Sequence, residues 1–345
     1  MPKFTARRIC VVRLSALGDT IHALALVNGL RHGYPDAHIS WVLQPLPYEL
    51  VKHQTDVDEF VVFNPRGGVR EWCRLTSFLR ANPFDLAVFP QVSAKAGLIG
   101  MLIKAPVKLG FDLARSRELN WLVTNHRIPP HPPQHVQDQF FEFLDYLDVN
   151  QTEAEWNIRF TPEELQWRER FFAELGRPAV AFVVASSNPR KDWSPRGYAR
   201  VMDYVDAQLG MCPLIVGGPS RRERQVADDI VRASRCMPRV ALEKPVRHTL
   251  LQLSGSRVVV SPDTGPLHSA VALNVPTIGL YGYSNPRRCG PYRRFQDLLI
   301  DKYTDPNDNG HIERKTRKHR MERIEPGEVI GKIELALDRY VSVLN

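Results

Sequence analysis

Short runs rich in apolar and β-branched residues alternate with longer amphipathic stretches twice along this chain of 345 residues. The predicted strands of the first series are residues 9–14, 39–42, 59–63 and 86–89. Those of the second series are residues 179–184, 213–216, 240–241, 258–261 and 277–280. Alternation of strands and helices is typical of a parallel sheet covered by helices on both faces. We therefore predict an α/β fold with two Rossmann-like parallel-sheet domains that face each other across a cleft.

Two breaks in the pattern divide the chain. The proline-rich run at 128–133 can form neither a helix nor a central strand, and a helical pattern at 135–147 follows it. A second series starts at the helix signal Thr-Pro-Glu-Glu of residues 161–164. We predict one domain over 1–155, a second over 160–325, and a C-terminal helix over 326–345 that packs back on the first domain.

Cysteine usage and the N-terminus indicate the compartment. The five cysteines are scattered without metal-ligand or redox spacing, and an odd number favours a reducing environment. The N-terminal apolar run ends at Leu14, which is too short for a signal peptide or a transmembrane helix. We expect a cytoplasmic protein.

Charge favours an anionic partner, because 46 Lys and Arg residues stand against 38 Asp and Glu, a net charge of +8. Basic residues concentrate at 311–323 without interleaved aromatics, and a solvated loop is the simpler interpretation of that run. No nucleic-acid-binding motif accompanies the charge, so we predict no nucleic-acid partner. Any membrane attachment would be peripheral, electrostatic and sensitive to salt.

The most informative local run is Ser-Pro-Asp-Thr-Gly-Pro-Leu-His at 261–268, which follows a predicted strand and opens a helical pattern. Unpaired N–H groups and the helix dipole at such a junction attract anions. Gly265 permits close approach of a ligand to the backbone, and His268, three residues later, lies on the same side. The run predicts a phosphate site, although Asp263 is equally readable as an ordinary helix cap.

The loop after the first strand reads Arg-Leu-Ser-Ala-Leu-Gly-Asp-Thr at 13–20. It holds a single glycine instead of the three of a dinucleotide fingerprint, which disfavours a nicotinamide-dependent dehydrogenase, and the chain has no P-loop. Asp19 is readable as a helix cap or as a carboxylate able to take a proton from an incoming hydroxyl.

Two loops of the second half directly follow predicted strands, and the first of them carries groups that suit a diphosphate. The loop at 185–194 contains Ser186, Ser187 and Lys191 directly after a strand, where the hydroxyls can donate hydrogen bonds and the ammonium can neutralise charge. The turn at 217–219 is followed by Glu223, which is readable as part of a tight turn or as a helix-start carboxylate.

Taken in order, Leu-Ser-Ala-Leu-Gly-Asp at 14–19, Lys-Asp-Trp-Ser at 191–194 and Asp-Thr-Gly-Pro-Leu-His at 263–268 resemble the heptosyltransferase family. The resemblance extends to Gly-Phe-Asp at 110–112, Arg-Ser-Arg-Glu at 115–118 and the segment 281–292, so it covers nearly the whole chain. It implies the GT-B architecture, with an acceptor-side first domain and a donor-binding second domain.

The resemblance also implies an activity, namely inverting transfer of a heptose from ADP-heptose to the lipopolysaccharide inner core. Its residue assignments fall into three groups. The catalytic residues would be Asp19, as general base, and Lys191. The donor-binding residues would be Ser186, Ser187, Lys191, Glu223, Asp263, Thr264, Gly265 and His268. The acceptor-binding residues would be Ser15, Gly18, Arg115, Arg117 and His135.

The partners implied are a nucleotide sugar and an anionic glycolipid. We expect no cofactor and no metal, since the helix N-terminus and Lys191 can neutralise charge on the leaving nucleotide. The alternatives are a different nucleotide-sugar donor or a non-catalytic nucleotide-sugar-binding protein. The base-selecting residues are sought in 218–223 and 242–246.

Overall fold

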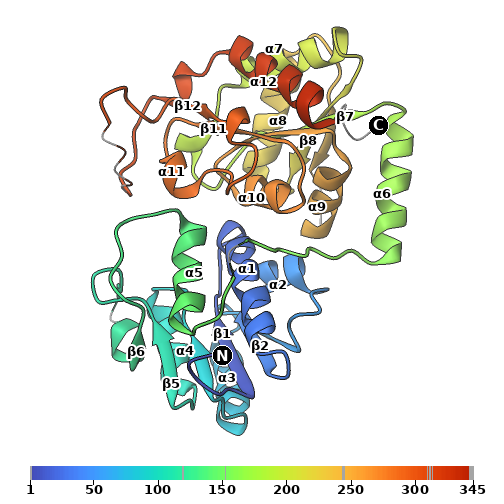
Figure 1. The fold of residues 1–345 in the computed structure, drawn as a ribbon. Coiled ribbons are helices and arrows are strands. Elements are labelled where there is room, and N and C mark those ends of the chain that lie inside the picture. Colours follow the sequence, from blue (N-terminus) through green and yellow to red (C-terminus); the bar gives the residue numbers. More distant parts are fainter. Residues whose placement is uncertain are drawn as a thin grey trace. The chain divides into compact units, whose positions relative to one another are not determined.

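The computed structural model describes residues 2–118, 120–151, 153–242, 245–308, 310, 312 and 314–341. The chain divides into two compact units (Figure 1). Unit 1 comprises residues 1–132 and 136–159, and unit 2 comprises 133–135 and 160–345. The main division therefore falls between Arg159 and Phe160, close to the start of the second predicted series.

Unit 1 is built on a fully parallel sheet in the order β3-β2-β1-β4-β5-β6. Its strands are β1 (Arg8–Val12), β2 (His38–Leu43), β3 (Glu59–Val62), β4 (Leu86–Val88), β5 (Val107–Gly110) and β6 (His126–Arg127). Its helices are α1 (Leu17–Gly33), α2 (Pro45–Val51), α3 (Gly68–Ala81), α4 (Ala94–Leu102) and α5 (Val136–Tyr146). Central β1 pairs on both sides, with Val11 opposite Trp41 and Val88.

Unit 2 repeats this topology in the order β12-β11-β10-β7-β8-β9, again with every pair parallel. Its strands are β7 (Ala179–Val183), β8 (Cys212–Gly217), β9 (Arg239–Leu242), β10 (Val258–Pro262), β11 (Thr277–Tyr281) and β12 (Ile300–Asp301). Its helices are α6 (Pro162–Leu175), α7 (Pro195–Ala207), α8 (Arg221–Ala233), α9 (Val246–Gly255), α10 (Gly265–Ala272), α11 (Pro286–Cys289) and α12 (Pro326–Ala336). Both sheets have the doubly wound strand order of Rossmann-like domains, which confirms the predicted fold class.

The predicted strand series omitted β5, β6 and β12. Two of them, β6 and β12, have only two residues each, and β5 is a four-residue strand whose first half is only partly buried. Each lies at or next to a sheet edge. A strand there has fewer neighbours to pack against than a central strand, so it does not need the continuous apolar run by which a central strand is recognised.

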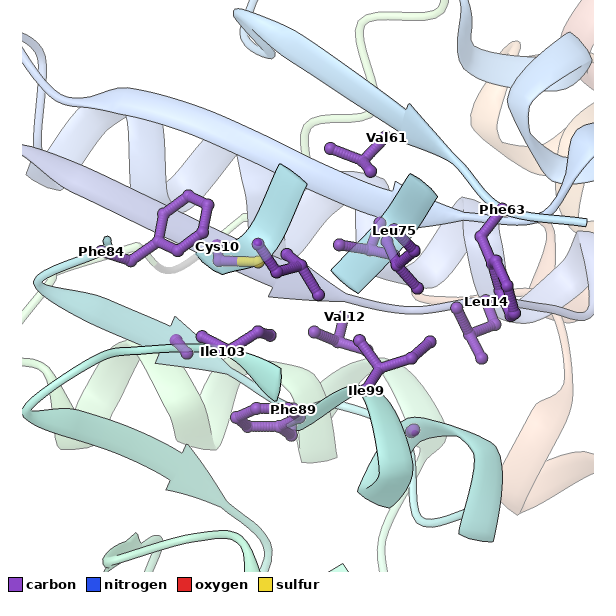
Figure 2. Packing of buried hydrophobic residues seen from close by; sticks show 14 residues of the cluster. Cys10, Val12, Leu14, Val61, Phe63, Leu75, Phe84, Phe89, Ile99 and Ile103 are labelled. Carbon is purple, nitrogen blue, oxygen red and sulfur yellow. The ribbon is translucent and has the colours of Figure 1, made fainter. Parts of the chain in front are cut away.

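The sheet of unit 1 is covered by a tightly packed apolar cluster. Figure 2 shows side chains of β1, including Cys10 and Val12, meeting Leu75 from α3 and Ile99 from α4. An equivalent cluster in unit 2 joins β7, β8 and β10 to α6, α9 and α10. These two cores hold the central strands in place, and with them the loops at the strand ends.

The chain that follows α5 packs on α1 through Val149, Gln151 and Glu155. Two glycines permit the approach, because a Cβ added at Gly33 would come within 2.4 Å of Val149, and one at Gly29 within 2.2 Å of Gln151. The Asn28 side chain also donates a 2.7 Å hydrogen bond to the Glu155 carbonyl. Close backbone approach is the property that glycine alone supplies at these two positions.

The predicted helix start at 161–164 is confirmed. The Thr161 hydroxyl accepts from the Glu164 N–H, and the Glu164 carboxylate accepts from the Thr161 N–H, which forms a capping box. The same carboxylate binds the fully buried Arg247 of α9 at 2.6 Å. The start of unit 2 is thereby fixed to its own helix layer.

The C-terminal helix α12 belongs to unit 2 and packs on α7 and β11. Its buried apolar residues Val329, Ile333 and Ala336 form the contact face, and Tyr204 of α7 donates to Glu334 at 2.5 Å. The packing of residues 326–345 on the first domain stays a prediction. Within the described residues, no helix is both long and apolar enough to cross a bilayer.

Candidate active site

Each sheet has a switch point where the strand order reverses, between β1 and β4 in unit 1 and between β7 and β10 in unit 2. Ligands of doubly wound sheets bind outside the carboxyl ends of the strands at such points. The predicted catalytic and diphosphate-binding residues follow β1, β7 and β10. The topology thus places them at the two switch points.

In unit 1, Asp19 occupies the first turn of α1, at the switch point after β1. Its side chain is 41% exposed, and its Oδ2 lies 2.5 Å from Nη2 of Arg13. The same oxygen accepts a long hydrogen bond of 3.4 Å from the Ala16 N–H. Asp19 is therefore an accessible carboxylate with a fixed orientation, as a general base requires.

Arg13 is the partner that the site prediction left out. It is 9% exposed, its Nη1 donates to the Pro90 carbonyl at 2.6 Å, and its guanidinium lies 5.5 Å from the ring centroid of Phe140. Arg13 thus joins the loop after β1 to the loop after β4 across the switch point. Nothing in the local sequence marks this side chain as buried, so it resembles an ordinary surface arginine until the fold is known.

Ser15 and Gly18, predicted to contact the acceptor, flank Ala16 and Leu17 in the same turn, and both are partly buried. The loop is held from the other side, since the Leu14 N–H donates to Gln91 Oε1 at 2.6 Å. Ser15 and Gly18 therefore lie close in sequence to Asp19 on a loop of defined conformation.

The two predicted acceptor arginines have different surroundings. Arg115 is mostly buried, with Nη2 2.6 Å from Glu142 Oε2, Nε bound to Asp112 and a 3.0 Å bond to the Pro129 carbonyl. Burial lowers its pKa, but the bonds to Glu142 and Asp112 outweigh that effect and raise it overall. Arg117 is exposed. The guanidinium of Arg115 is thus committed to holding its loop, whereas that of Arg117 is accessible to an anionic acceptor.

His135 groups with unit 2 although it directly precedes α5. Its Nε2 lies 3.0 Å from the Gly290 carbonyl, and its ring centroid lies 4.9 Å from that of Tyr292. The predicted acceptor residue is therefore held against the segment that follows β11, a contact that the sequence did not indicate.

In unit 2, Lys191 and Asp263 form the centre of the site. Lys191 lies in a short 3₁₀ turn after β7, and Asp263 directly follows β10. The Lys191 ammonium is 2.6 Å from Asp263 Oδ2 and donates to the Asp263 carbonyl at 3.2 Å. This pair spans the switch point, so two residues 72 positions apart in the chain form one charged unit.

The Asp263 carboxylate contacts several polar side chains besides Lys191. Its Oδ2 also accepts from Ser284 at 2.7 Å and from the Cys289 thiol at 3.5 Å, and its Oδ1 lies 3.5 Å from His268 Nε2. Burial alone would raise its pKa, but the hydrogen bond to His268 and the charge of Lys191 outweigh burial and hold the pKa far below its usual value. Asp263 is therefore ionised throughout the physiological range.

The turn between Asp263 and α10 leaves the helix N-terminus open. Among the described side chains none caps α10 at Thr264, whose hydroxyl instead lies 3.0 Å from that of Ser261. Gly265 and Pro266 occupy the first helical positions, and the N-terminal dipole adds partial positive charge beside Lys191. An uncapped N-terminus next to an ammonium group is suited to an anion.

The two serines after β7 differ. The Ser186 hydroxyl donates to the Asn188 carbonyl at 2.6 Å, and its N–H donates to Asp192 at 2.8 Å, so Ser186 shapes the loop. Arg222 of α8 binds both Asp192 and the Ser186 carbonyl. Ser187 is exposed on this braced loop, where its hydroxyl is accessible to a ligand.

Glu223 is tied to the turn after β8. Its carboxylate accepts from the Gly218 N–H at 2.8 Å and from the Ser220 hydroxyl at 2.5 Å. The structure thus gives it the helix-start role that the sequence left open. Nearby, Arg224, Asp228, Val240 and Leu242 line a hollow of about 250 Å³. Glu243 and Lys244, within the segment where base-selecting residues are predicted, lie outside the described residues.

Tyr283 is a residue that the site prediction missed. Hydrogen bonds with Thr316, Asn188 and Arg190 lower the pKa of its phenol to about 8. The phenol therefore joins the loop after β7 to the segment after β11, next to Ser284. Only the long-range contact reveals this, because Tyr283 lies 95 positions from Asn188 in the sequence.

The two doubly wound parallel-sheet units, with charged residues at their switch points, match the GT-B class of fold. A model of glycosyltransferase family 9 (heptosyltransferase) matches residues 72–315. The chain belongs to this family and is a glycosyltransferase.

Individual relatives agree with this assignment. The chain is 30% identical over 302 residues to the lipopolysaccharide core heptosyltransferase OpsX of Haemophilus influenzae, covering 87% of this chain and 86% of that one. A family 9 glycosyltransferase of Veillonella parvula has the same fold, with a TM-score of 0.83, 22% identity and coverage of 96% and 97%. The heptosyltransferase WaaC of E. coli, solved with ADP, matches with a TM-score of 0.75, 20% identity and coverage of 95% and 99%.

Proposed function

We propose that this chain transfers a heptose from ADP-heptose to the lipopolysaccharide core, with inversion at the anomeric carbon. The activity of the relative OpsX and the ADP in the similar WaaC structure support the acceptor and donor classes. The single observation that carries the donor side is the uncapped N-terminus of α10 beside the Lys191–Asp263 pair. It offers a diphosphate both helix-dipole and ammonium charge.

In this mechanism the Asp19 carboxylate accepts the proton of the attacking acceptor hydroxyl. The hydroxyl oxygen forms the new glycosidic bond while the bond from the anomeric carbon to the diphosphate oxygen breaks, and ADP leaves with the bonding electron pair. Lys191, the N–H groups at Gly265 and the hydroxyls of Thr264 and Ser187 stabilise the charge that develops on ADP. The proposed reaction requires no metal and no cofactor.

Asp263 acts on Lys191 and His268 in this scheme. Because Asp263 stays ionised, it fixes the ammonium and the imidazole at the turn where the diphosphate arrives. On the acceptor side, exposed Arg117 binds an anionic group of the glycolipid, and Arg115 holds the loop that presents Arg117. The acceptor is lipid-borne, so we place the enzyme peripherally at the cytoplasmic face of the inner membrane.

The donor is tested with purified protein against ADP-heptose, other ADP-sugars, UDP-sugars and GDP-sugars. A ligand at one hundred times its dissociation constant should add roughly 2.7 kcal/mol to the stability of the folded protein. Preferential stabilisation by ADP-heptose is expected, and preference for another nucleotide sugar would replace the proposed donor.

Transfer itself is followed by ADP release and by the mass of a core-oligosaccharide acceptor, in buffer with and without a chelator. We expect a product with inverted anomeric configuration and undiminished turnover in chelator. Stabilisation by donor without any product would support a binding protein instead, and an absolute requirement for a divalent ion would overturn the metal-free scheme.

A further inference from the structure

Unit 1 carries an exposed apolar patch, which consists of Leu98 and Met101 of α4 together with Trp121 and Leu122 of the 3₁₀ turn at 120–122. Their exposed fractions are 46, 62, 39 and 61%, respectively. Single exposed apolar residues are ordinary on a protein surface, but four on two contacting elements are not scattered singly. The patch is outside the donor-binding turn of unit 2 and is not used by the proposed mechanism.

The fold brings the two parts of the patch together. A Cβ added at Gly97 would lie 3.7 Å from Asn120, and one at Gly100 would lie 3.0 Å from Val123, so α4 presents its glycine face to the 120–123 segment. Leu98 and Met101 each follow one of these glycines and, three positions apart, share a neighbouring face of α4. The exposed Trp121 and Leu122 belong to the 3₁₀ turn that contacts α4 (Figure 1 shows α4 in unit 1).

Hydrogen bonds fix this surface in place. The Glu118 carboxylate accepts from the Ala94 N–H at 2.6 Å, which ties the loop before the 3₁₀ turn to the start of α4. Arg127 donates to the Trp121 carbonyl at 3.0 Å, and Lys108 donates to the Gly100 carbonyl at 2.9 Å. These hydrogen bonds hold the backbone of the patch in place, and two of them come from the cationic side chains of Arg127 and Lys108.

The charge around the patch has one dominant sign. Residues 91–128 contain six Lys and Arg but only two acidic residues, Asp112 and Glu118. Asp112 is paired with Arg115, and Glu118 is bound to the α4 N-terminus. Lys95, Lys104 and Arg117 are exposed, and Lys95 lies three positions before Leu98 on the same face of α4.

We propose that this patch docks unit 1 on the surface of an anionic phospholipid bilayer. Apolar side chains with a tryptophan suit the headgroup boundary, and the surrounding cations are attracted to anionic headgroups. A protein partner of matching chemistry would have to be acidic around an apolar centre, whereas an anionic bilayer supplies both properties over any area. The inference rests on the proposed function in that a lipid-borne acceptor requires the enzyme to work at a membrane.

The test measures sedimentation of the full-length protein with lipid vesicles at low and high salt. One set of vesicles contains phosphatidylcholine alone, and the other also contains about one-quarter phosphatidylglycerol, which is anionic. The patch variant is M101S/L122S, and the control variant is V69S/M237S, which changes two other strongly exposed apolar residues. Binding to the anionic vesicles should fall about tenfold or more in the patch variant and stay unchanged in the control. Binding of the wild type should weaken in high salt and on neutral vesicles.

Three outcomes would overturn the proposal. They are the absence of wild-type binding to anionic vesicles, equal binding by the patch variant, and a patch variant that changes the oligomeric state, which would identify the surface as a contact between copies. Vesicle binding is measured without donor or acceptor, so it does not depend on transfer. Transfer to a delipidated core oligosaccharide should be the same in M101S/L122S and wild type, and its loss in both would count against the proposed function alone.

Discussion

Asp19 of unit 1 and Asp263 of unit 2 both follow a central parallel strand, and both lie beside a cation at a switch point. The side chain of Asp19 is 41% exposed and has one charged partner, Arg13. The side chain of Asp263 is 9% exposed and contacts Lys191, His268, Ser284 and Cys289. One strand-to-helix turn therefore presents a carboxylate to solvent, and the other buries it within a polar cluster.

The role of a carboxylate therefore depends on its exposure to solvent and on how many hydrogen-bonding and ionic partners it has. A base must exchange a proton with an incoming hydroxyl, so it needs an open face, and Asp19 has one. A carboxylate bound by several donors stays ionised and instead fixes the groups around it, as Asp263 does. Five experiments test this contrast between the two carboxylates.

The largest effect is expected for Asp19→Asn. If Asp19 is the general base, kcat should fall about 10²- to 10⁴-fold while the dissociation constant of the donor stays the same. Steady-state transfer assays and donor titration measure the two quantities. Asp36→Asn, a change at an exposed aspartate of the same unit, is the control. Turnover of Asp19→Asn within tenfold of wild type would remove Asp19 from this role.

Asp263→Asn should act mainly on stability and donor binding. Removing one partner of a buried pair leaves Lys191 without its counter-charge, and because Lys191 is 26% exposed we expect a loss of about 2 kcal/mol in the free energy of unfolding. Urea unfolding measures this loss. The control Asp229→Asn breaks an exposed pair with Arg232 and should cost less than about 0.5 kcal/mol. Equal effects of the two changes would contradict the contrast between a buried and an exposed carboxylate.

Arg13→Lys should lower kcat about tenfold, equivalent to about 1.4 kcal/mol, with little change in donor affinity. Lysine keeps the charge but cannot bind Asp19 and the Pro90 carbonyl in the same forked geometry. The pH profile of kcat should also change, which a purely structural role for Arg13 would not produce. Arg31→Lys, which alters the similar pair with Asp58, is the control and should leave kcat unchanged.

The pH dependence of stability offers a smaller effect with a defined sign. The pKa of Asp263 is lowered by folding, so its stabilising contribution is complete above the unfolded value near 4 and is lost as the pH falls toward the lower folded value. The stability advantage of wild type over Asp263→Asn should therefore shrink by about 1 kcal/mol between pH 5 and pH 3. An advantage that is constant or grows toward acid would disprove the assignment.

The smallest effect concerns the two arginines of the acceptor side. Arg117→Ala should raise the acceptor KM about threefold at low salt, with kcat and thermal stability unchanged, because an exposed cation contributes less than about 1 kcal/mol. Arg115→Ala should instead lower the melting temperature, since it removes the cation that neutralises the mostly buried Glu142 and Asp112. The reverse pattern would exchange the roles given to the two residues.

Much of the fold was predictable because central strands and helix starts carry local signals. The strands β1, β7 and β10 each contain a buried run of three or more apolar residues, and α6 begins at the Thr161–Glu164 capping box. The edge strands β6 and β12 have two residues each and carry no such signal. The packing of α12 on α7 could not be read from the sequence, because the periodicity of an amphipathic helix marks its apolar face but not the element that this face contacts.

For the site, the residues that follow each central strand can be read directly from the sequence: Asp19 after β1, Lys191 after β7, and Asp263 with Thr264 and Gly265 after β10. Strand ends and helix starts are short-range features, so they can be read along the chain. Tertiary packing, in contrast, brings Arg13 to Asp19 and places Lys191, Ser284 and Cys289 around Asp263. Burial and ionisation depend on neighbours far away in the sequence, and only the packed sheet brings those neighbours within hydrogen-bonding distance.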